Sequence, residues 1–263
     1  MKLSYENQLT NWVNKEKVGV SLLKSCGTLM YEHGIELVLF RNKLLEIGVS
    51  ELLSLFEYAN NELERKTTID DALELANSII KMNLPPSKID IGLLTAEYNE
   101  GEIKDYDKFL LSKLKHINSK KNHNRIAKDV ILYGFGRIGR LVARELIKQA
   151  GTGQQLRLKA IVVRSLTDEQ IVKRIDLFRN DSVHGIFKGV VKVDLKNQSM
   201  VANGQVIKFI SGKNPEDIDY TKHDINNALL IDNTGAFTTK EDLSRHLNAI
   251  GVNKVLLTAP GKE

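Results

Sequence analysis

Three glycines at positions 134, 136 and 139 have the spacing needed to hold the phosphates of a dinucleotide. They form the pattern G-x-G-x-x-G, which follows the apolar run Val130–Tyr133 and precedes the helical pattern Leu141–Ile147. In such a unit Gly134 permits a sharp turn, Gly136 lets a pyrophosphate approach the backbone, and Gly139 lets the helix pack on its strand. Because the free N–H groups at a helix start attract anions, this loop predicts a dinucleotide site.

The segment that separates NAD from NADP comes after the next apolar run, Leu158–Val163. In NAD-specific sites a carboxylate about 20 residues beyond the glycines binds the adenosine ribose and excludes a 2′-phosphate. Here the position holds Arg164, whose charge and fork geometry suit a 2′-phosphate, with Ser165 as a second donor. The alternative is an exposed arginine with Asp168 or Glu169 on the ribose, so both NAD and NADP are candidate cofactors.

Two later strand ends carry further candidates. Asn233, Thr234, Gly235 and Phe237 follow the apolar run Ala228–Ile231, and Thr258 and Ala259 end the last one. Open α/β sheets bind their ligands at the carboxyl ends of their strands, which places these residues near the glycine loop. A plain strand-to-helix turn with a capping threonine is the alternative for Thr234 and Gly235.

Alternating strands and helices are expected to position these residues. Strands are predicted over 130–133, 158–163, 228–231 and 254–258, with helices over 141–148, 168–178 and 239–250. Short strands over 189–195, 200–202 and 206–210 surround a hairpin turn at Asn203-Gly204. Residues 128–263 are therefore predicted to form an α/β domain, a Rossmann-like parallel sheet with helices.

The first part of the chain has a different pattern. Apolar residues recur at helical spacing from residue 5 to about 116, including residues 37–45, so residues 1–117 are predicted to be a mostly α-helical region. Ser50 and Thr68 are expected to open two helices, Pro85-Pro86 to stop the one that runs through residues 72–80, and the last helix to cover 106–117. The polar, basic segment 118–127 is predicted to be a linker, either a solvated tether or a contact for a polyanion.

Composition excludes several classes of protein. The single cysteine, Cys26, permits no intrachain disulfide and no zinc site of cysteine pairs, and it is expected to be a buried apolar residue. The histidines have no metal-ligand spacing, so no metal site is expected. The net charge of +5 suits an anionic partner, which a phosphorylated ligand satisfies; nucleic acid is not the expected partner. Without a 20-residue apolar run or a signal-peptide core, the chain is expected to be cytoplasmic and not to bind membranes.

Four segments resemble the glyceraldehyde-3-phosphate dehydrogenase family. The family's N-G-F-G-R-I-G-R corresponds to Tyr133–Arg140, D-S-x-H-G to Asp181–Gly185, S-T-G-x-F to Asn233–Phe237, and I-S-A-P-S-K-D to Leu257–Glu263. The resemblance covers roughly residues 128–263 and departs at Tyr133, where the family usually has Asn. It implies that the backbone of Arg137 and Ile138, in the loop that also contains Phe135, touches the pyrophosphate, and that the segments at 233–237 and 258–259 line the cofactor.

The resemblance also implies a reaction. Family members oxidise a phosphorylated aldehyde to an acyl phosphate: a thiolate attacks the aldehyde, a histidine takes the proton, and hydride passes to the nicotinamide. The family's nucleophile and substrate-phosphate arginines lie beyond the segment matched by Leu257–Glu263, so no catalytic residue is expected within this chain, which alone would bind the cofactor without turnover. The complete protein is expected to be a homo-oligomer.

Two alternatives to a glyceraldehyde-3-phosphate dehydrogenase stay open. One is a sister enzyme acting on a related sugar phosphate such as erythrose 4-phosphate. The other is a non-catalytic module in which the helical region docks a partner and the Rossmann-like region senses a dinucleotide. His184 is not expected to be catalytic, because its match is to a structural segment of the family.

Overall fold

The computed structural model describes residues 4–117, 127–148, 151, 154–212 and 214–262. The chain divides into two compact units, an N-terminal unit (Met1–Arg125 with Ala150–Gly153) and a C-terminal unit (Ile126–Gln149 with Gln154–Glu263), which are described separately. The predicted linker over 118–127 falls almost wholly outside the described residues. No helix in the described ranges is long and apolar enough to span a bilayer.

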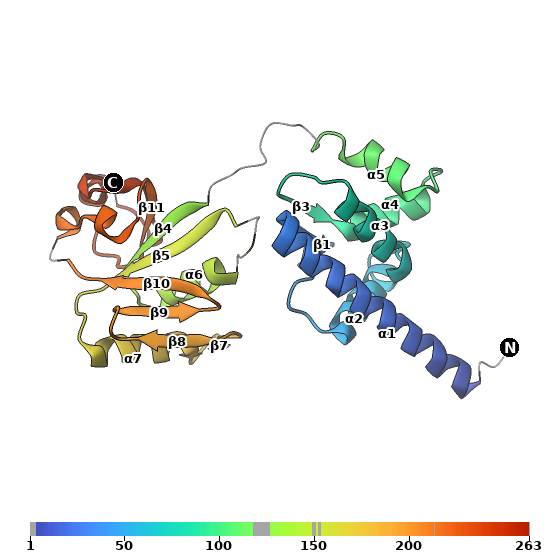
Figure 1. The fold of residues 1–263 in the computed structure, drawn as a ribbon, viewed down its shortest axis with the longest axis horizontal. Coiled ribbons are helices and arrows are strands. Elements are labelled where there is room, and N and C mark those ends of the chain that lie inside the picture. Colours follow the sequence, from blue (N-terminus) through green and yellow to red (C-terminus); the bar gives the residue numbers. More distant parts are fainter. Residues whose placement is uncertain (1–3, 118–126, 149–150, 152–153, 213, 263) are drawn as a thin grey trace. The chain divides into compact units, whose positions relative to one another are not determined.

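Helices dominate the N-terminal unit, as predicted, and they surround a small sheet (Figure 1). The helical elements are α1 (Tyr5–Thr28), the π-helical turn η1 (Leu29–His33), α2 (Val49–Asn61), α3 (Ile69–Lys81), α4 (Ile91–Glu100) and α5 (Tyr106–Leu114). The strands are β1 (Ile35–Leu39), β2 (Asn42–Lys43) and β3 (Ser87–Asp90), in the order β2-β1-β3. Thr68 caps α3 by accepting a hydrogen bond from Asp71 N, as expected. Trp12, the single tryptophan, lies on α1 and is 41% exposed.

Two predictions for this unit are wrong. Residues 37–45 are not helical: β1 is a buried strand that pairs in parallel with β3, about 50 residues further along the chain. A short apolar run does not distinguish a buried strand from a buried helix, and the partner strand decided the outcome. Ser50 does not cap α2, because the helix begins at Val49 with Gly48 as its N-cap residue.

A seven-stranded sheet forms the centre of the C-terminal unit, in the order β12-β11-β4-β5-β10-β9-β8 (Figure 1). The first five of these strands run parallel to one another, whereas β9 pairs antiparallel with β10 and with β8. The strands are β4 (Lys128–Tyr133), β5 (Leu156–Val162), β8 (Val191–Asp194), β9 (Ser199–Ala202), β10 (Gln205–Ile210), β11 (Ala228–Asp232) and β12 (Val252–Leu257), with the small pair β6 (Asn180–Asp181) and β7 (Gly185–Ile186) outside the sheet. This is the predicted Rossmann-like arrangement.

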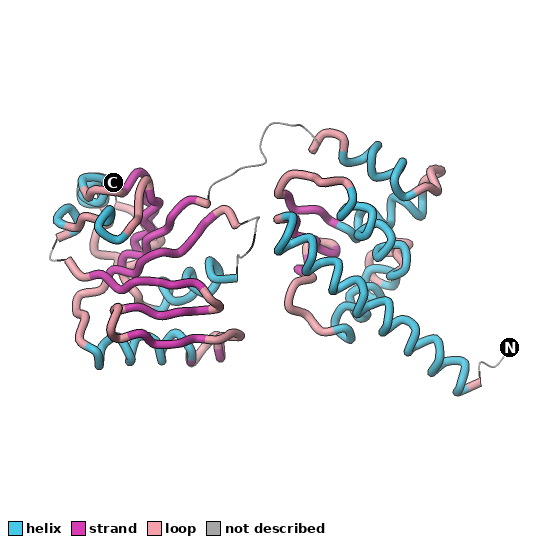
Figure 2. Tube along the Cα trace, in the orientation of Figure 1, coloured by secondary structure: helices cyan, strands magenta, loops and turns pink. Residues whose placement is uncertain are grey.

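Both faces of the large sheet are covered (Figure 2). The helices α6 (Arg137–Lys148) and α7 (Asp168–Arg179) pack on one face with Ala143, Leu146, Ile171 and Ile175. The other face is covered by the 3-10 turns η2 (Pro215–Asp217), η3 (Tyr220–His223) and η4 (Arg245–Asn248), with α8 (Lys240–Ser244) preceding η4. The helix predicted over 239–250 is therefore two shorter pieces. Burial on both faces explains why these strands are continuous apolar runs in the sequence.

Candidate functional site

The glycine loop joins β4 to α6 at the carboxyl end of the parallel strands. Gly134 has a φ of +92°, a conformation that side-chain-bearing residues rarely adopt, and a Cβ there would lie 2.7 Å from Thr234 Cγ2. The Gly134 amide donates a hydrogen bond to Val162 O at 3.0 Å, which ties the turn to the end of β5. The loop is therefore held by two neighbouring strands.

The other two glycines have different surroundings. A Cβ at Gly139 would overlap the carbonyl oxygen of Gly134, so the start of α6 packs directly on the loop. A Cβ at Gly136 would meet no atom within 4 Å. Open space beside Gly136, together with the N–H groups of the first turn of α6 that have no partner within the helix, suits the close approach of an anionic group.

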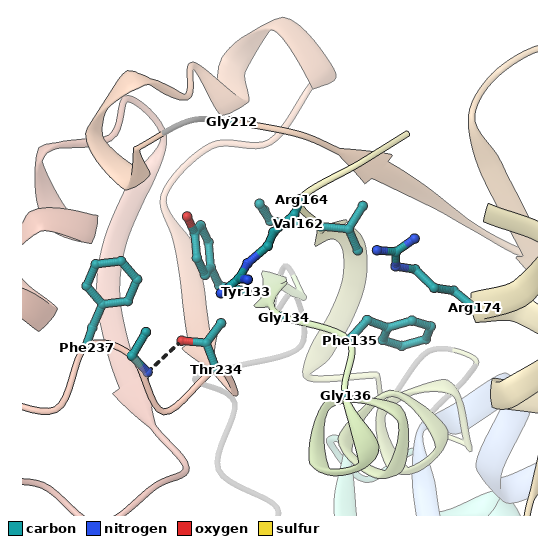
Figure 3. A pocket seen from close by; sticks show the side chains of 12 residues that line it. Tyr133, Gly134, Phe135, Gly136, Val162, Arg164, Arg174, Gly212, Thr234 and Phe237 are labelled. Atoms are coloured by element: carbon teal, nitrogen blue, oxygen red, sulfur yellow. Dashed lines mark hydrogen bonds between the residues drawn. The ribbon is translucent and has the colours of Figure 1, made fainter. Parts of the chain in front are cut away.

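The loop opens onto a cavity of about 400 Å³ (Figure 3). Six of the predicted site residues line it: Gly134, Phe135, Gly136, Arg164, Thr234 and Phe237. The structure adds six residues that the sequence did not single out as ligands: Tyr133, Val162, Val163, Arg174, Gly212 and Ala236. Residues from five separate segments of the sequence thus meet at one edge of the sheet.

The remaining predicted residues lie beside the lining without belonging to it. Arg137, Ile138 and Gly139 form the first turn of α6, and Ser165 directly follows Arg164. Asn233 and Gly235 flank Thr234, and Ala259 lies 3.9 Å from the position of a Cβ at Gly235. The Thr258 hydroxyl donates to Asp232 O at 3.0 Å and to Asn233 Oδ1 at 3.3 Å, so it connects β12 to the turn after β11.

Two arginines give the cavity a positive wall. Arg164 follows β5 and is exposed, whereas Arg174 reaches the cavity from the second turn of α7 and is partly buried (Figure 3). No carboxylate belongs to the lining among the described residues, and Asp168 and Glu169 lie instead in the first turn of α7. The electrostatics of this cavity favour an anionic ligand.

An aromatic cluster forms the part of the wall that lies beside Arg164 (Figure 3). The Tyr133 ring meets the rings of Phe237 and His246 edge to face, with centroid distances of 5.9 and 4.6 Å. Burial raises the pKa of Tyr133, and the charge of Asp232 raises it further, whereas Arg245 and Arg164 act in the opposite direction. Tyr133 is thus a neutral hydroxyl on an apolar ring, where the resembling family usually has Asn.

A buried hydrogen-bonded pair supports this wall. His246 Nε2 lies 2.8 Å from Asp232 Oδ2, and both side chains are fully buried. The other carboxylate oxygen of Asp232 accepts from the Thr234 amide and hydroxyl, each at 2.7 Å. Asp232 therefore fixes both the turn that carries Thr234 and the histidine beneath Tyr133 and Phe237. The sequence contains only a weak signal for this pair: Asp232 is a polar residue at the end of an apolar strand, and His246 lies 14 residues further along the chain.

The segment Asp181–Gly185 anchors the start of α6. Arg140 lies 3.4 Å from Asp181 and also donates to Phe135 O at 3.5 Å, and its side chain is only 13% exposed. The pKa of Asp181 is held far below its usual range, first by the backbone and ring N–H of His184 and also by Val183 N and Arg140. His184 does not line the cavity. Arg140 is thus a packed structural residue and not part of a solvated helical turn.

The only thiol lies in the other unit. Cys26 belongs to the core of the N-terminal unit, where burial raises its pKa to about 12. A thiol that is protonated at neutral pH and shielded from solvent is a poor nucleophile. The described residues also contain no cluster of three or more His, Cys, Asp or Glu side chains able to hold a metal ion.

Comparisons with known proteins point to one family. Residues 128–240 match the glyceraldehyde 3-phosphate dehydrogenase NAD-binding domain. The chain is 38% identical over 223 residues to a glyceraldehyde-3-phosphate dehydrogenase-like protein of Pseudomonas aeruginosa. The aligned stretch covers 83% of this chain and 48% of that protein. Glyceraldehyde-3-phosphate dehydrogenase of Lactococcus lactis is 36% identical over 128 residues, or 49% of this chain and 34% of that enzyme.

The two matches differ in extent. The stretch shared with the Pseudomonas protein is longer than the C-terminal unit, so it includes part of the N-terminal unit. The stretch shared with the Lactococcus enzyme is shorter than that unit. The chain spans about half or less of the length of these relatives.

Proposed function

The chain belongs to the glyceraldehyde-3-phosphate dehydrogenase family, and we propose that its C-terminal unit holds the nicotinamide cofactor for oxidation of a phosphorylated aldehyde. The family match makes residues 128–240 an NAD-binding domain. The observation that carries the proposal is the glycine loop: a helix start with open space at Gly136, at the edge of a cavity with two arginines and no carboxylate in its described lining.

The residues of the loop fit a bound dinucleotide. The first-turn amides of α6 donate to the pyrophosphate, and Gly136 leaves room for it. Thr234 and Phe237 lie across the cavity, where the hydroxyl and the ring orient the rest of the cofactor. The cofactor, when bound, accepts a hydride; the role of these residues is to bind and orient it.

Arg164 supports NADP as a cofactor beside NAD. It lines the cavity at the end of β5, where an NAD-specific site would place a carboxylate, and its side chain has no recorded partner in the described structure. Its guanidinium donates to a 2′-phosphate, with Ser165 as a second donor.

This chain by itself is proposed to bind the cofactor without oxidising the aldehyde. Its one cysteine is buried in the other unit, so no accessible thiolate is present to attack a carbonyl. We propose that oxidation of the aldehyde needs groups that these 263 residues do not supply, with glyceraldehyde 3-phosphate as the leading substrate and erythrose 4-phosphate as the second. Production of NADH or NADPH by the purified chain from either aldehyde and phosphate would contradict this assignment.

The test of cofactor binding is a titration. We expect the nicotinamide fluorescence of NADH and of NADPH to change saturably when the purified chain is added. Failure of both to bind at millimolar concentration would overturn the proposal. Arg164→Asp should weaken NADPH binding at least tenfold while changing NADH binding little, because a carboxylate repels the 2′-phosphate. Equal losses for the two cofactors would remove Arg164 from this role.

A further inference from the structure

Arg174 is an arginine that the glycine-loop pattern does not explain. It lies on α7, a helix that packs on the sheet through Ile171, Ile175 and Phe178, and its side chain reaches the cavity that Gly136 and Arg164 also line (Figure 3). Its Nη1 donates to the carbonyl oxygen of Gln170 at 3.0 Å and to Gln170 Oε1 at 3.1 Å. These contacts within one helix turn hold the guanidinium in place and leave its other N–H groups without a recorded partner in the described structure.

The other arginines of this unit show what is unusual about Arg174. Four of them pair with a carboxylate: Arg140 with Asp181, Arg157 with Asp129, Arg179 with Asp176 and Arg245 with Glu216. Arg144 is buried and donates to backbone carbonyl oxygens. Of the remaining three, Arg164 and Arg174 line the cavity, whereas Arg137 is exposed at the start of α6 and does not; none of the three has a carboxylate partner among the described residues.

Because Arg174 is partly buried, the lack of a carboxylate partner among the described residues costs it free energy. Withdrawal from water lowers the pKa of Arg174, and burial is the only cause of this shift. A partly buried cation without a counter-ion is stabilised strongly when an anion enters beside it. The carboxylates nearest in sequence, Asp168, Glu169 and Asp176, are all exposed, and none belongs to the cavity lining.

We propose that Arg174 is a specificity-determining residue that binds the 2′-phosphate of NADPH together with Arg164. The inference rests on the proposed function, because it takes the cavity to be the cofactor site. Arg164 follows β5 and Arg174 lies on α7, and both side chains line the cavity. In Figure 3 the Arg174 guanidinium extends into the cavity from α7, whereas the Arg164 guanidinium lies beside Tyr133. The 2′-phosphate group supplies the anion that the cavity lining lacks.

The experiment compares Arg174→Gln with Arg174→Lys in the full chain. Dissociation constants are measured for NADPH and NADH, and also for adenosine 2′,5′-bisphosphate and 5′-AMP, which contain the adenosine half alone. We expect Arg174→Gln to weaken NADPH and the bisphosphate about tenfold or more, and NADH and 5′-AMP less than about threefold. Arg174→Lys should recover part of the loss, because it keeps the charge without the fork.

Lys173→Gln is the matched control. It removes one positive charge from the neighbouring, exposed position of α7, outside the cavity lining. A loss of NADPH affinity equal to that of Arg174→Gln would show a general charge effect and overturn the proposal. Equal losses of NADH and NADPH in Arg174→Gln would place Arg174 on the shared adenosine instead, and unchanged affinities would leave it no role in binding.

The two proposals fail in different ways. If the unmodified chain binds neither cofactor, the proposed function fails. If the unmodified chain binds both and Arg174→Gln does not change their ratio, only the role of Arg174 fails. Thermal unfolding of each variant, compared with the unmodified chain, separates a loss of folding from a loss of affinity.

Discussion

Individual residues of the glycine loop have separable roles. A Cβ at Gly139 would meet the Gly134 carbonyl, so this glycine is needed for packing, whereas Gly136 faces open space and is proposed to be needed for the ligand. The G-x-G-x-x-G spacing predicted all three positions. It did not distinguish which glycine serves the fold and which the ligand, because that depends on how α6 lies against β4 and on the position of Thr234.

Gly136→Val should abolish cofactor binding without destabilising the protein. The side chain would occupy the space left for the pyrophosphate, so we expect NADH and NADPH to weaken alike, by more than tenfold, with little change in the melting temperature. Fluorescence titration and thermal unfolding check the two parts.

Gly139→Ala is the comparison. Its Cβ would overlap the Gly134 carbonyl, so we expect a loss of about 1–3 kcal/mol in the free energy of unfolding. If Gly136→Val lowered stability as much as Gly139→Ala does, the space beside Gly136 would be structural and not a ligand site.

Secondary-structure elements of the C-terminal unit follow the sequence closely, and those of the N-terminal unit do so less well. The strands β4, β5, β10 and β11 each contain a short, mostly apolar run between turn signals, so local pattern was sufficient. In contrast, β1 pairs with β3 across about 50 residues, and no local pattern records that pairing. The apolar residues of β1 therefore fitted a helix equally well.

The candidate site divides in the same way. Residues on loops after strands, such as Arg164 and Thr234, were predictable because parallel strands end at one edge of the sheet. Arg174 was not predictable, because an arginine in a helix with many polar residues is expected to face solvent. Its position at the cavity depends on how α7 packs on the sheet. The Asp232–His246 pair was also missed, because its members lie 14 residues apart, on β11 and η4, and no local pattern shows that these two elements meet.

Asp232→Ala tests how much one side chain stabilises the contact between β11, the turn at Thr234 and η4. Its carboxylate accepts from the Thr234 amide and hydroxyl and contacts His246, so its loss leaves several buried polar groups without a partner. We expect the free energy of unfolding to fall by about 3 kcal/mol or more, measured by urea denaturation.

Glu241→Ala provides the control for Asp232→Ala. Glu241 is an exposed carboxylate in the first turn of α8, and its removal should cost less than about 1 kcal/mol. A similar small effect for Asp232→Ala would mean that the buried pair contributes nothing to holding the turn.

At the scale of the whole molecule, the chain has separate hydrophobic cores. One core lies in the N-terminal unit, and two others cover the opposite faces of the large sheet. Cys26 belongs to the first of these, whereas the cavity proposed for the cofactor lies at the edge of the large sheet. The thiol therefore reports on the N-terminal unit, not on the site.

Cys26 should be unreactive in the folded protein. Burial raises its pKa to about 12 from 9.0, so alkylation at pH 8 should be slow until denaturant exposes the thiol. The folded state holds this proton more tightly than the unfolded state does. The associated stability is therefore complete below pH 9 and is lost as the pH rises toward 12. Rapid alkylation without denaturant would contradict the buried position; Cys26→Ala is the unreactive control and should remove this pH dependence.

The position of Trp12 confines tryptophan fluorescence to the N-terminal unit. The single indole lies on α1, and the C-terminal unit contains tyrosine and phenylalanine but no tryptophan. Indole emission during denaturation consequently follows the N-terminal unit, whereas circular dichroism sums over both. Where the two units differ in stability, the two signals trace different curves, and neither alone defines a melting temperature for the chain.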